Sequence, residues 1–250
     1  MIPPVFLADA VQLGAASRGG RLTLAGAEGR HATTVRRLRP GERVDLTDGA
    51  GLLAECEVLA ARPGSGELDL NVFAMHREDE PSCRVTAVQA ILKGDRGELA
   101  VELMTQVGVD TIVPWAAERS VARWRPDRED KALSRWRTTA REAAKQSRRA
   151  RFPDVTGQVS TAGVAARVAG ADLALLLDAE ADRPLRDVQM PAVGEIVLVI
   201  GPEGGVSPAE AAELTAAGAV PVRLGPSVLK SSTAGAVAGA LVLSGSGRWA

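Results

Sequence analysis

The fold of this chain is decided by Ile196-Val197-Leu198-Val199-Ile200-Gly201-Pro202-Glu203-Gly204-Gly205. The run of five apolar residues predicts a strand buried on both faces of a sheet. Ser207-Pro208-Ala209-Glu210 follows the glycines, and its serine and glutamate predict a capping box that begins a helix. The glycine loop is therefore predicted to lie at the carboxyl end of a strand, where open α/β sheets bind ligands. Taken alone, it is equally consistent with a tight turn that holds no ligand.

A second loop repeats this design near the C-terminus. Residues 220–224 predict a strand, Gly225-Pro226-Ser227-Val228-Leu229-Lys230 follows, and residues 233–243 form a helical pattern rich in alanine and glycine. A phosphate-binding P-loop would need a glycine where Leu229 stands, and the dinucleotide fingerprint G-x-G-x-x-G is absent from both loops. Neither loop is built for a polyphosphate. The small residues Gly235 and Gly239 predict close packing of the last helix against another element.

Outward from these loops, apolar runs alternate with helical patterns. The rest of the C-terminal part predicts strands at 85–92, 111–114 and 173–177, and helices at 98–107, 127–147 and 208–217. This alternation indicates a mostly parallel sheet. The first part of the chain is instead β-rich, with strands at 43–46, 53–59 and 67–73 and a short helix at 31–38, which suggests a small barrel. A charged, proline-containing stretch at 76–82 reads as a linker, so we expect domains at 1–74 and 83–250.

The composition indicates a globular protein. Apolar residues make up 46% of the 250 residues and charged residues 24%, with a net charge of -1, which is ordinary for a globular protein. Cys56 and Cys83 lack metal-ligand spacing, and the only histidines are His31 and His76, so we expect reduced packing cysteines and no metal site. No secretory signal or membrane-length apolar run is present. We expect a soluble cytoplasmic protein without a membrane partner.

At its two loops the chain resembles the RsmE-type 16S rRNA uridine-N3 methyltransferases of the SPOUT superfamily. The resemblance rests on Gly201-Pro202-Glu203-Gly204-Gly205 followed, some twenty residues on, by Leu224-Gly225-Pro226, Val228-Leu229-Lys230 and Thr233-Ala234. Matches elsewhere extend it over nearly the whole chain: His31, Val35 and Arg37 before Pro40-Gly41; Lys93-Gly94-Asp95-Arg96; Val107-Gly108-Val109; Glu118-Arg119-Ser120; Glu142-Ala143-Ala144 with Gln146, Ser147, Arg149 and Pro153.

The resemblance implies a PUA-like β-barrel that binds RNA, followed by a SPOUT α/β domain with a trefoil knot near residues 196–243. Knots are very rare, and nothing in composition or periodicity indicates this one. It also implies a homodimer, S-adenosylmethionine as the methyl donor, and one uridine of 16S rRNA, within the 30S subunit, as the target. The donor would contact Leu177, Ile200, Gly201, Gly205, Leu224, Gly225, Val228 and Leu229.

Methylation of uracil at N3 requires loss of the N3 proton, which positive groups favour. Arg119, Arg149 and Lys230 are the candidates for this catalytic role, and no general base can be named. The family usually has arginine at position 230 and an acid at position 232, where this chain has Lys230 and Ser232. The alternatives are a SPOUT methyltransferase acting on tRNA or 23S rRNA and a non-catalytic RNA-binding protein.

Because aromatic residues are scarce, RNA contacts are expected to depend on charge. Basic residues at intervals of four, four and three predict a stripe on one face of the long helix, formed by Arg137, Arg141, Lys145 and Arg148. Alternatively, these cations form a solvated face near a helix C-terminus. The predicted RNA contacts are Arg37, Arg137, Arg141, Lys145, Arg148 and Arg149.

Overall fold

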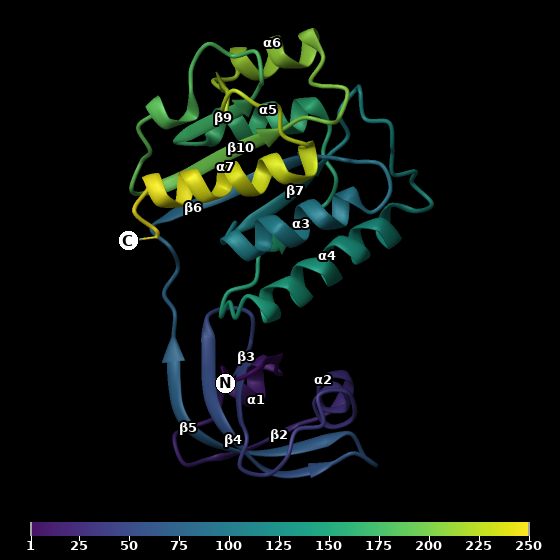
Figure 1. Ribbon diagram of the computed structural model, residues 1–250, viewed down its shortest axis with the longest axis vertical. Coiled ribbons are helices and arrows are strands. Elements are labelled where there is room, and N and C mark those ends of the chain that lie inside the picture. Colours follow the sequence, from purple (N-terminus) through teal and green to yellow (C-terminus); the bar gives the residue numbers. More distant parts are fainter. Residues whose placement is uncertain (1, 250) are drawn as a thin grey trace. The chain divides into compact units, whose positions relative to one another are not determined.

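The computed structural model describes residues 2–249 and divides the chain into two compact units (Figure 1). One unit comprises the chain up to Glu80 together with Ala144–Phe152, and the other comprises Pro81–Ala143 and the chain from Pro153 onward. The domains predicted at 1–74 and 83–250 do not include a segment that returns to the first unit from later in the chain, as Ala144–Phe152 does. Both cysteines are free and buried, which confirms their prediction as reduced packing residues.

The first unit is built on a five-stranded sheet of order β1-β3-β4-β5-β2. β1 runs parallel to β3, and the other pairs are antiparallel. Alternate residues of the long strands, such as Ala54, Cys56 and Val58, point into one apolar core. Desolvation in this core raises the pKa of the Cys56 thiol to about 12. The strands are β1 (Val5–Leu7), β2 (Arg21–Leu24), β3 (Arg43–Thr47), β4 (Leu52–Arg62) and β5 (Glu67–Arg77).

The helical turns of this unit differ from the prediction. The expected helix at 31–38 is wrong at both ends: α2 (Gly26–Arg30) comes first and continues into a π-helical turn, His31–Val35. Arg37 then adopts a left-handed backbone with φ of 54°, which ends the helical run before Pro40. A further short helix, α1 (Ala10–Gly14), is capped by the Asp9 side chain.

The returning segment is held in the first unit by specific bonds. The carbonyl of Ala150 accepts hydrogen bonds from Thr47 Oγ1 at 2.9 Å and from the Gly51 amide at 3.0 Å. Lys145 Nζ lies 2.8 Å from Glu28 Oε1, and only 6% of the lysine side chain is exposed. A buried cation with this geometry is held by its partner.

The second unit is a six-stranded parallel sheet of order β11-β9-β10-β6-β7-β8. The predicted parallel sheet is confirmed, with β10 beginning two residues before the expected strand and β11 ending two residues early. The strands are β6 (Cys83–Ala90), β7 (Thr111–Trp115), β8 (Asp154–Val155), β9 (Leu173–Leu177), β10 (Gly194–Ile200) and β11 (Val220–Val222).

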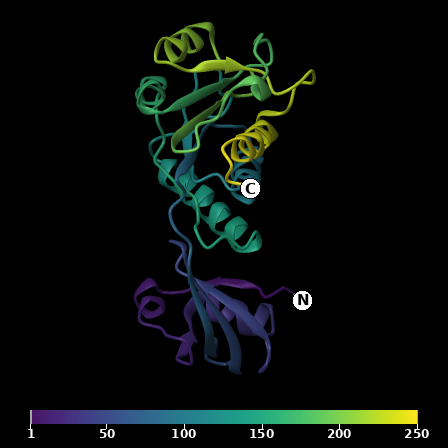
Figure 2. The ribbon, with the colours of Figure 1, turned by 90° about the vertical axis from the view of Figure 1, so that its left-hand side faces the viewer.

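Helices cover both faces of this sheet, as Figures 1 and 2 show. Along β10, Ile196, Leu198 and Ile200 join one apolar core, and Val197 and Val199 join the other. This alternation explains why the strand is a continuous apolar run. The helices are α3 (Arg96–Val107), α4 (Glu129–Gln146), α5 (Thr161–Gly170), α6 (Pro208–Ala216) and α7 (Ser231–Gly245). The sequence analysis predicts four of them and misses α5.

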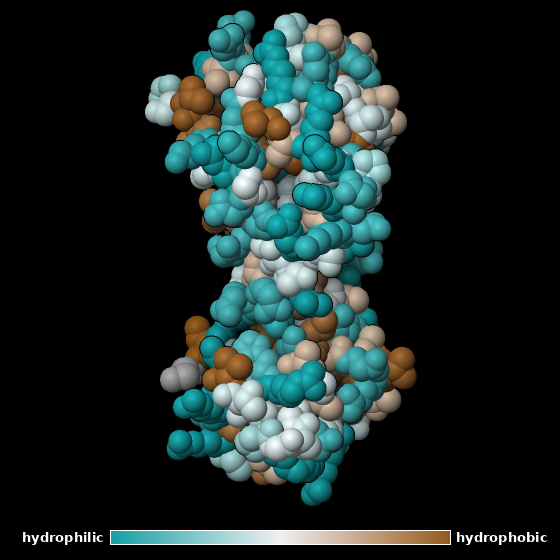
Figure 3. Space-filling model, turned by 90° about the vertical axis from the view of Figure 1, so that its right-hand side faces the viewer, coloured by the Kyte–Doolittle hydropathy of each residue, from teal (hydrophilic) through white to brown (hydrophobic). Residues whose placement is uncertain are grey.

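The predicted close packing of the last helix is confirmed. A Cβ atom at Gly235 would lie 2.7 Å from Met104 Sδ on α3, and one at Gly239 would lie 3.2 Å from Val109 Cγ2. α7 therefore approaches α3 more closely than larger residues would allow. Among residues 2–249, no helix is both long and apolar enough to cross a bilayer. The face drawn in Figure 3 is mostly hydrophilic, with apolar side chains in small separate groups.

Candidate functional site

The strands of the second unit end together at one edge of the sheet. In the strand register, Val222, Leu177, Ile200, Gln89 and Pro114 form one row across five neighbouring strands. Leu177 and Ile200 are thus side by side immediately before the loops that follow β9 and β10. The predicted location of the first glycine loop, at the carboxyl end of a strand, is confirmed.

The glycines of the first loop, Gly201–Gly205, exclude a side chain for different reasons. Gly205 has a φ of +73°, a conformation that L-residues with a side chain rarely adopt. At Gly201 a Cβ atom would lie 2.7 Å from Val206 Cγ2, and at Gly204 it would lie 3.3 Å from the carbonyl oxygen of Arg119. The loop is therefore closed on itself and lies against the segment that contains Arg119.

The capping box predicted for α6 is present. The Ser207 hydroxyl accepts a hydrogen bond from the Glu210 amide, and the Glu210 carboxylate accepts one from the Ser207 amide. The same carboxylate also accepts from the Glu118 amide and from Thr161 Oγ1, both at 2.8 Å. Glu210 thus joins the first glycine loop to the segment after β7 and to the start of α5.

These bonds change the acidity of Glu210. Burial raises its pKa, but the hydrogen bonds from Glu118, Thr161 and Ser207 outweigh burial, so that the pKa lies below its ordinary value of 4.5. Because the folded-state pKa is lowered, the carboxylate stabilises the fold above about pH 4.5 and loses this contribution as the pH falls below it.

We expect Glu210→Gln to be less stable by about 1–3 kcal/mol at pH 7, because an amide cannot accept all of these hydrogen bonds. Thermal unfolding of both proteins between pH 7 and pH 3 checks this. The wild-type melting temperature should fall more steeply than that of the variant below about pH 4.5. Parallel profiles would show that Glu210 contributes nothing to the acid dependence.

The second loop runs from the end of β11 to the start of α7. Its apolar side chains face outward: Val228 is 81% exposed and Leu229 is 37% exposed. Lys230 is the N-cap residue of α7, and its carbonyl accepts the first bonds of the helix. A cation at this end of a helix opposes the helix dipole. Exposed apolar groups beside a cation suit a ligand that has both apolar and electron-rich parts.

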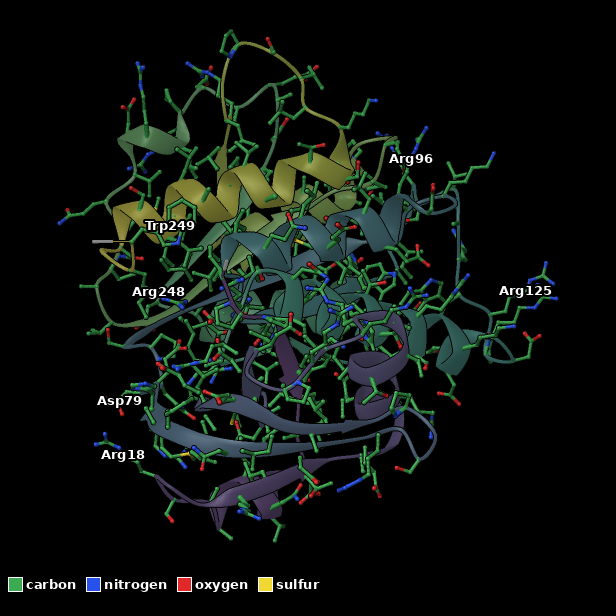
Figure 4. The ribbon with its side chains drawn as sticks, turned by 60° about the horizontal axis from the view of Figure 1, so that its bottom comes forward. Arg18, Asp79, Arg96, Arg125, Arg248 and Trp249 are labelled. Carbon is green, nitrogen blue, oxygen red and sulfur yellow. The ribbon has the colours of Figure 1, made fainter. Side chains whose placement is uncertain are left out.

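The two loops are bonded to each other. Ser231 Oγ, in the first turn of α7, donates a hydrogen bond to the carbonyl of Gly201 and accepts one from Gln89 Nε2 at 3.2 Å. Glu203 of the first loop pairs with Arg96 at the start of α3, at 3.2 Å; Figure 4 labels Arg96. This pair ties Glu203, and with it the first loop, to the start of α3.

Of the candidate catalytic residues, Arg119 and Lys230 flank these loops, Arg119 Nη1 lying 3.5 Å from the carbonyl of Gly204. Arg149 belongs to the other unit. Sequence reasoning missed Gln89 and Ser231. A signal existed for Gln89, which is a polar residue in an otherwise apolar strand.

The predicted basic stripe on the long helix is wrong for two of its four members. Lys145 is buried against Glu28, and Arg148 lies beyond the end of α4, where its backbone is left-handed with φ of 60°. Arg137 and Arg141 are exposed. The last residues of α4, from Ala144 on, belong to the first unit, where Lys145 has a carboxylate partner.

Comparison with known proteins matches both parts of the chain to families. Residues 78–243 match the model of an RNA methyltransferase domain, and residues 24–70 match that of an RNA methyltransferase PUA domain. The chain is 46% identical over 245 residues to the ribosomal RNA small subunit methyltransferase E of Mycobacterium bovis, with 95% of this chain and 90% of the relative covered.

Solved structures agree with this match. The chain resembles a ribosomal RNA small subunit methyltransferase E from Neisseria gonorrhoeae bound to S-adenosyl methionine, with a TM-score of 0.83, 26% identity and coverage of 97% and 98% of the two chains. It also resembles a probable rRNA-methyltransferase from Porphyromonas gingivalis, with a TM-score of 0.77, 27% identity and coverage of 99% and 100%. The chain therefore has a mixed α/β fold with a PUA domain.

Proposed function

The chain belongs to the ribosomal RNA small subunit methyltransferase E family, and on that premise we propose that it methylates 16S rRNA with S-adenosylmethionine as donor. The observation that carries this proposal is the pair of glycine loops at one edge of the parallel sheet, bonded through Ser231 and Gly201. The target is N3 of one uridine, as the resemblance implies.

The loops fit the proposed donor. Gly205 has a positive φ that residues with a side chain rarely adopt. Because it has no Cβ atom, backbone N–H and C=O groups can approach a ligand there. Val228 and Leu229 present apolar surface that an adenine ring would cover. The residues proposed to hold the donor are Leu177, Ile200, Gly201, Gly205, Leu224, Gly225, Val228 and Leu229.

The bound donor supplies an electrophilic methyl group on a sulfonium sulfur. The carbon–sulfur bond breaks as the bond from carbon to uracil N3 forms, and the N3 proton is released to solvent. The chain's own contribution is to align the two reactants and to favour the deprotonated uracil with positive charge. Lys230 and Arg119, on the two sides of the loops, and Arg149 are the groups proposed for the second task.

RNA binding is proposed to use exposed basic residues of both units. Arg37 follows the π-helical turn of the first unit, and Arg137 and Arg141 lie on α4. Arg148 and Arg149 follow that helix. Each cation that contacts a phosphate releases counterions, so binding weakens as salt rises.

We expect Arg137→Ala combined with Arg141→Ala to reduce the slope of log K against log salt by up to about 2 for binding to a 16S rRNA fragment. Fluorescence anisotropy at several salt concentrations measures the slope. Arg186→Ala combined with Arg128→Ala, two exposed arginines paired only with neighbouring aspartates, is the matched control. An unchanged slope in the Arg137 and Arg141 variant would make this helix face only a solvated surface.

We also propose a PUA-like barrel in the first unit, a trefoil knot near 196–243 in the second, domains at 1–74 and 83–250, and a homodimer that acts in the cytoplasm on the 30S subunit. Exposed apolar residues on and beside the two packed helices support a dimer: Leu99 of α3, Leu241 of α7 and Trp249, which Figure 4 labels.

For the dimer, light scattering at micromolar concentration should give a mass of twice 26.0 kDa. Leu241→Glu should reduce it toward the monomer, because a charge on a covered apolar face is costly. A fully active protein of monomeric mass would contradict the proposed homodimer.

The activity is tested with 30S subunits from a strain that lacks the modification, incubated with the protein and methyl-labelled donor. We expect label in 16S rRNA and a reverse-transcription stop at one uridine, because a methyl group on N3 blocks base pairing. Free 16S rRNA, 23S rRNA and tRNA are the comparison substrates. Label only in tRNA or 23S rRNA would indicate the alternative substrate class, and donor or RNA binding without transfer would indicate a non-catalytic protein.

A further inference from the structure

Gln89 occupies an unusual place for a polar residue. It is the penultimate residue of β6, it is fully buried, and it stands in the register row between Ile200 and Pro114. Val85 and Ala87, which alternate with it along the strand, belong to the core beneath α3 and α7. The Gln89 side chain therefore lies under the first turn of α7, within reach of both glycine loops.

The hydrogen bonds around Gln89 have only one consistent direction. The carbonyl of Gly201 can only accept, so the single hydroxyl proton of Ser231 must point to it. Ser231 Oγ must then accept from Gln89 Nε2 at 3.2 Å, and Nε2 also donates to the carbonyl of Ala90 at 3.1 Å, so both contacts fix the NH2 group at this end of the amide. The result is a directed chain from Gln89 through Ser231 to Gly201, which joins the start of α7 to the first loop.

The same direction leaves the other end of the amide without a partner. Gln89 Oε1 is buried and accepts no hydrogen bond among the described residues. It cannot turn toward Ser231, because the hydroxyl proton is already used. A buried polar atom without a partner costs roughly 1–3 kcal/mol, whereas an apolar residue of the same size would avoid this cost. The unpartnered oxygen of Gln89 lowers the stability of the fold, and it lies at the carboxyl edge of the sheet, where the ligand is proposed to bind. This combination points to a role for Gln89 in binding.

We propose that Gln89 is a positioning residue of the methyl-donor site, which sets the distance between the two glycine loops through Ser231. This inference rests on the proposed function, because the ligand between the loops is taken to be S-adenosylmethionine. The donor must contact both loops at once, so a fixed distance between Gly201 and the second loop lowers the cost of ordering them on binding.

The test compares donor affinity with stability in Gln89→Leu, measured by calorimetric titration with S-adenosylmethionine and by thermal unfolding. The variant should bind the donor about tenfold more weakly, equivalent to about 1.4 kcal/mol. Its melting temperature should stay close to that of the wild type, because removal of the unpartnered oxygen offsets the loss of the Nε2 bonds to Ser231 and to the Ala90 carbonyl. A purely structural role would lower stability and leave affinity unchanged.

Thr86→Val is the matched control. Thr86 is a buried polar residue on the same strand, but it lies three positions before Gln89 and therefore on the other face of the sheet, where its hydroxyl donates to Glu195 Oε1 at 2.6 Å. We expect this variant to melt earlier and to bind the donor like the wild type. The two substitutions should therefore affect stability and affinity in opposite patterns.

Ser231→Ala, and its combination with Gln89→Leu, test the chain itself. Ser231 is only half-buried, so its variant serves even if Gln89→Leu does not fold. Ser231→Ala should weaken donor binding about tenfold or more, and the double variant should bind no more weakly than Ser231→Ala alone. Wild-type affinity in either single variant, or losses that multiply in the double variant, would overturn the inference. A wild-type protein that does not bind S-adenosylmethionine would instead contradict the proposed function.

Discussion

Gly205→Val should remove detectable binding of S-adenosylmethionine. The φ of +73° at Gly205 costs an ordinary L-residue about 1–2 kcal/mol and a β-branched residue more. Because, among residues 2–249, no heavy atom beyond Gly205 and its two chain neighbours lies within 4 Å of the position of a Cβ atom, the effect comes from backbone strain and not from a clash. The strained loop is expected to take another conformation, in which its backbone no longer faces the second loop. Calorimetric titration of the folded variant measures the loss.

Substitutions that vary the strain alone sharpen this test. Gly205→Ala should weaken donor binding about tenfold, and Gly205→Asn should weaken it less, because asparagine tolerates the left-handed region. Gly218, beyond the end of α6, also has a positive φ and open space around it. Gly218→Val should lower the melting temperature and leave donor affinity unchanged. Normal affinity in a well-folded Gly205→Val protein would mean that the donor binds elsewhere.

Local sequence signals predicted much of the second unit because their causes are local. The apolar run of β10 reflects burial on both faces, and the residues that cap α6 are neighbours in the chain. Gly108, which directly follows the helix predicted at 98–107, is the C-cap residue of α3 with φ of 108°. Helix α5 was missed although a local signal existed: Ser160 caps its first turn by accepting from the Gly163 amide.

Contacts between distant residues limit what the sequence can predict. The buried pair of Lys145 and Glu28 joins residues 117 positions apart. Spacing along the helix correctly placed Lys145 near other basic residues but carried no information about this partner. Likewise, Gln89 and Ser231 are 142 positions apart, and the packing of α7 against β6 brings them together. The glycines that form the loops were visible in the sequence, whereas the bond that joins the loops was not.

Lys230→Ala should lower turnover about a hundredfold and change donor affinity less than twofold. Removing one group that stabilises developing negative charge commonly costs a factor of 10² to 10³, and Lys230 is one of the groups proposed to stabilise such a charge on uracil. Lys230 makes no ion pair within residues 2–249, and it caps the positive end of α7, where a cation disfavours the helix. We therefore expect the melting temperature of Lys230→Ala to stay the same or rise slightly.

Single-turnover methylation of 30S subunits, with donor binding measured separately, distinguishes these effects. Lys230→Arg should retain most of the turnover, because it keeps the charge and restores the residue usual in the family. Lys131→Ala, which removes an exposed lysine from the start of α4, should behave like the wild type. If Lys230→Ala weakens donor binding and turnover equally, its role is to hold the donor. If turnover is unchanged, Lys230 has no part in the reaction, and Arg119 and Arg149 remain as the sources of positive charge.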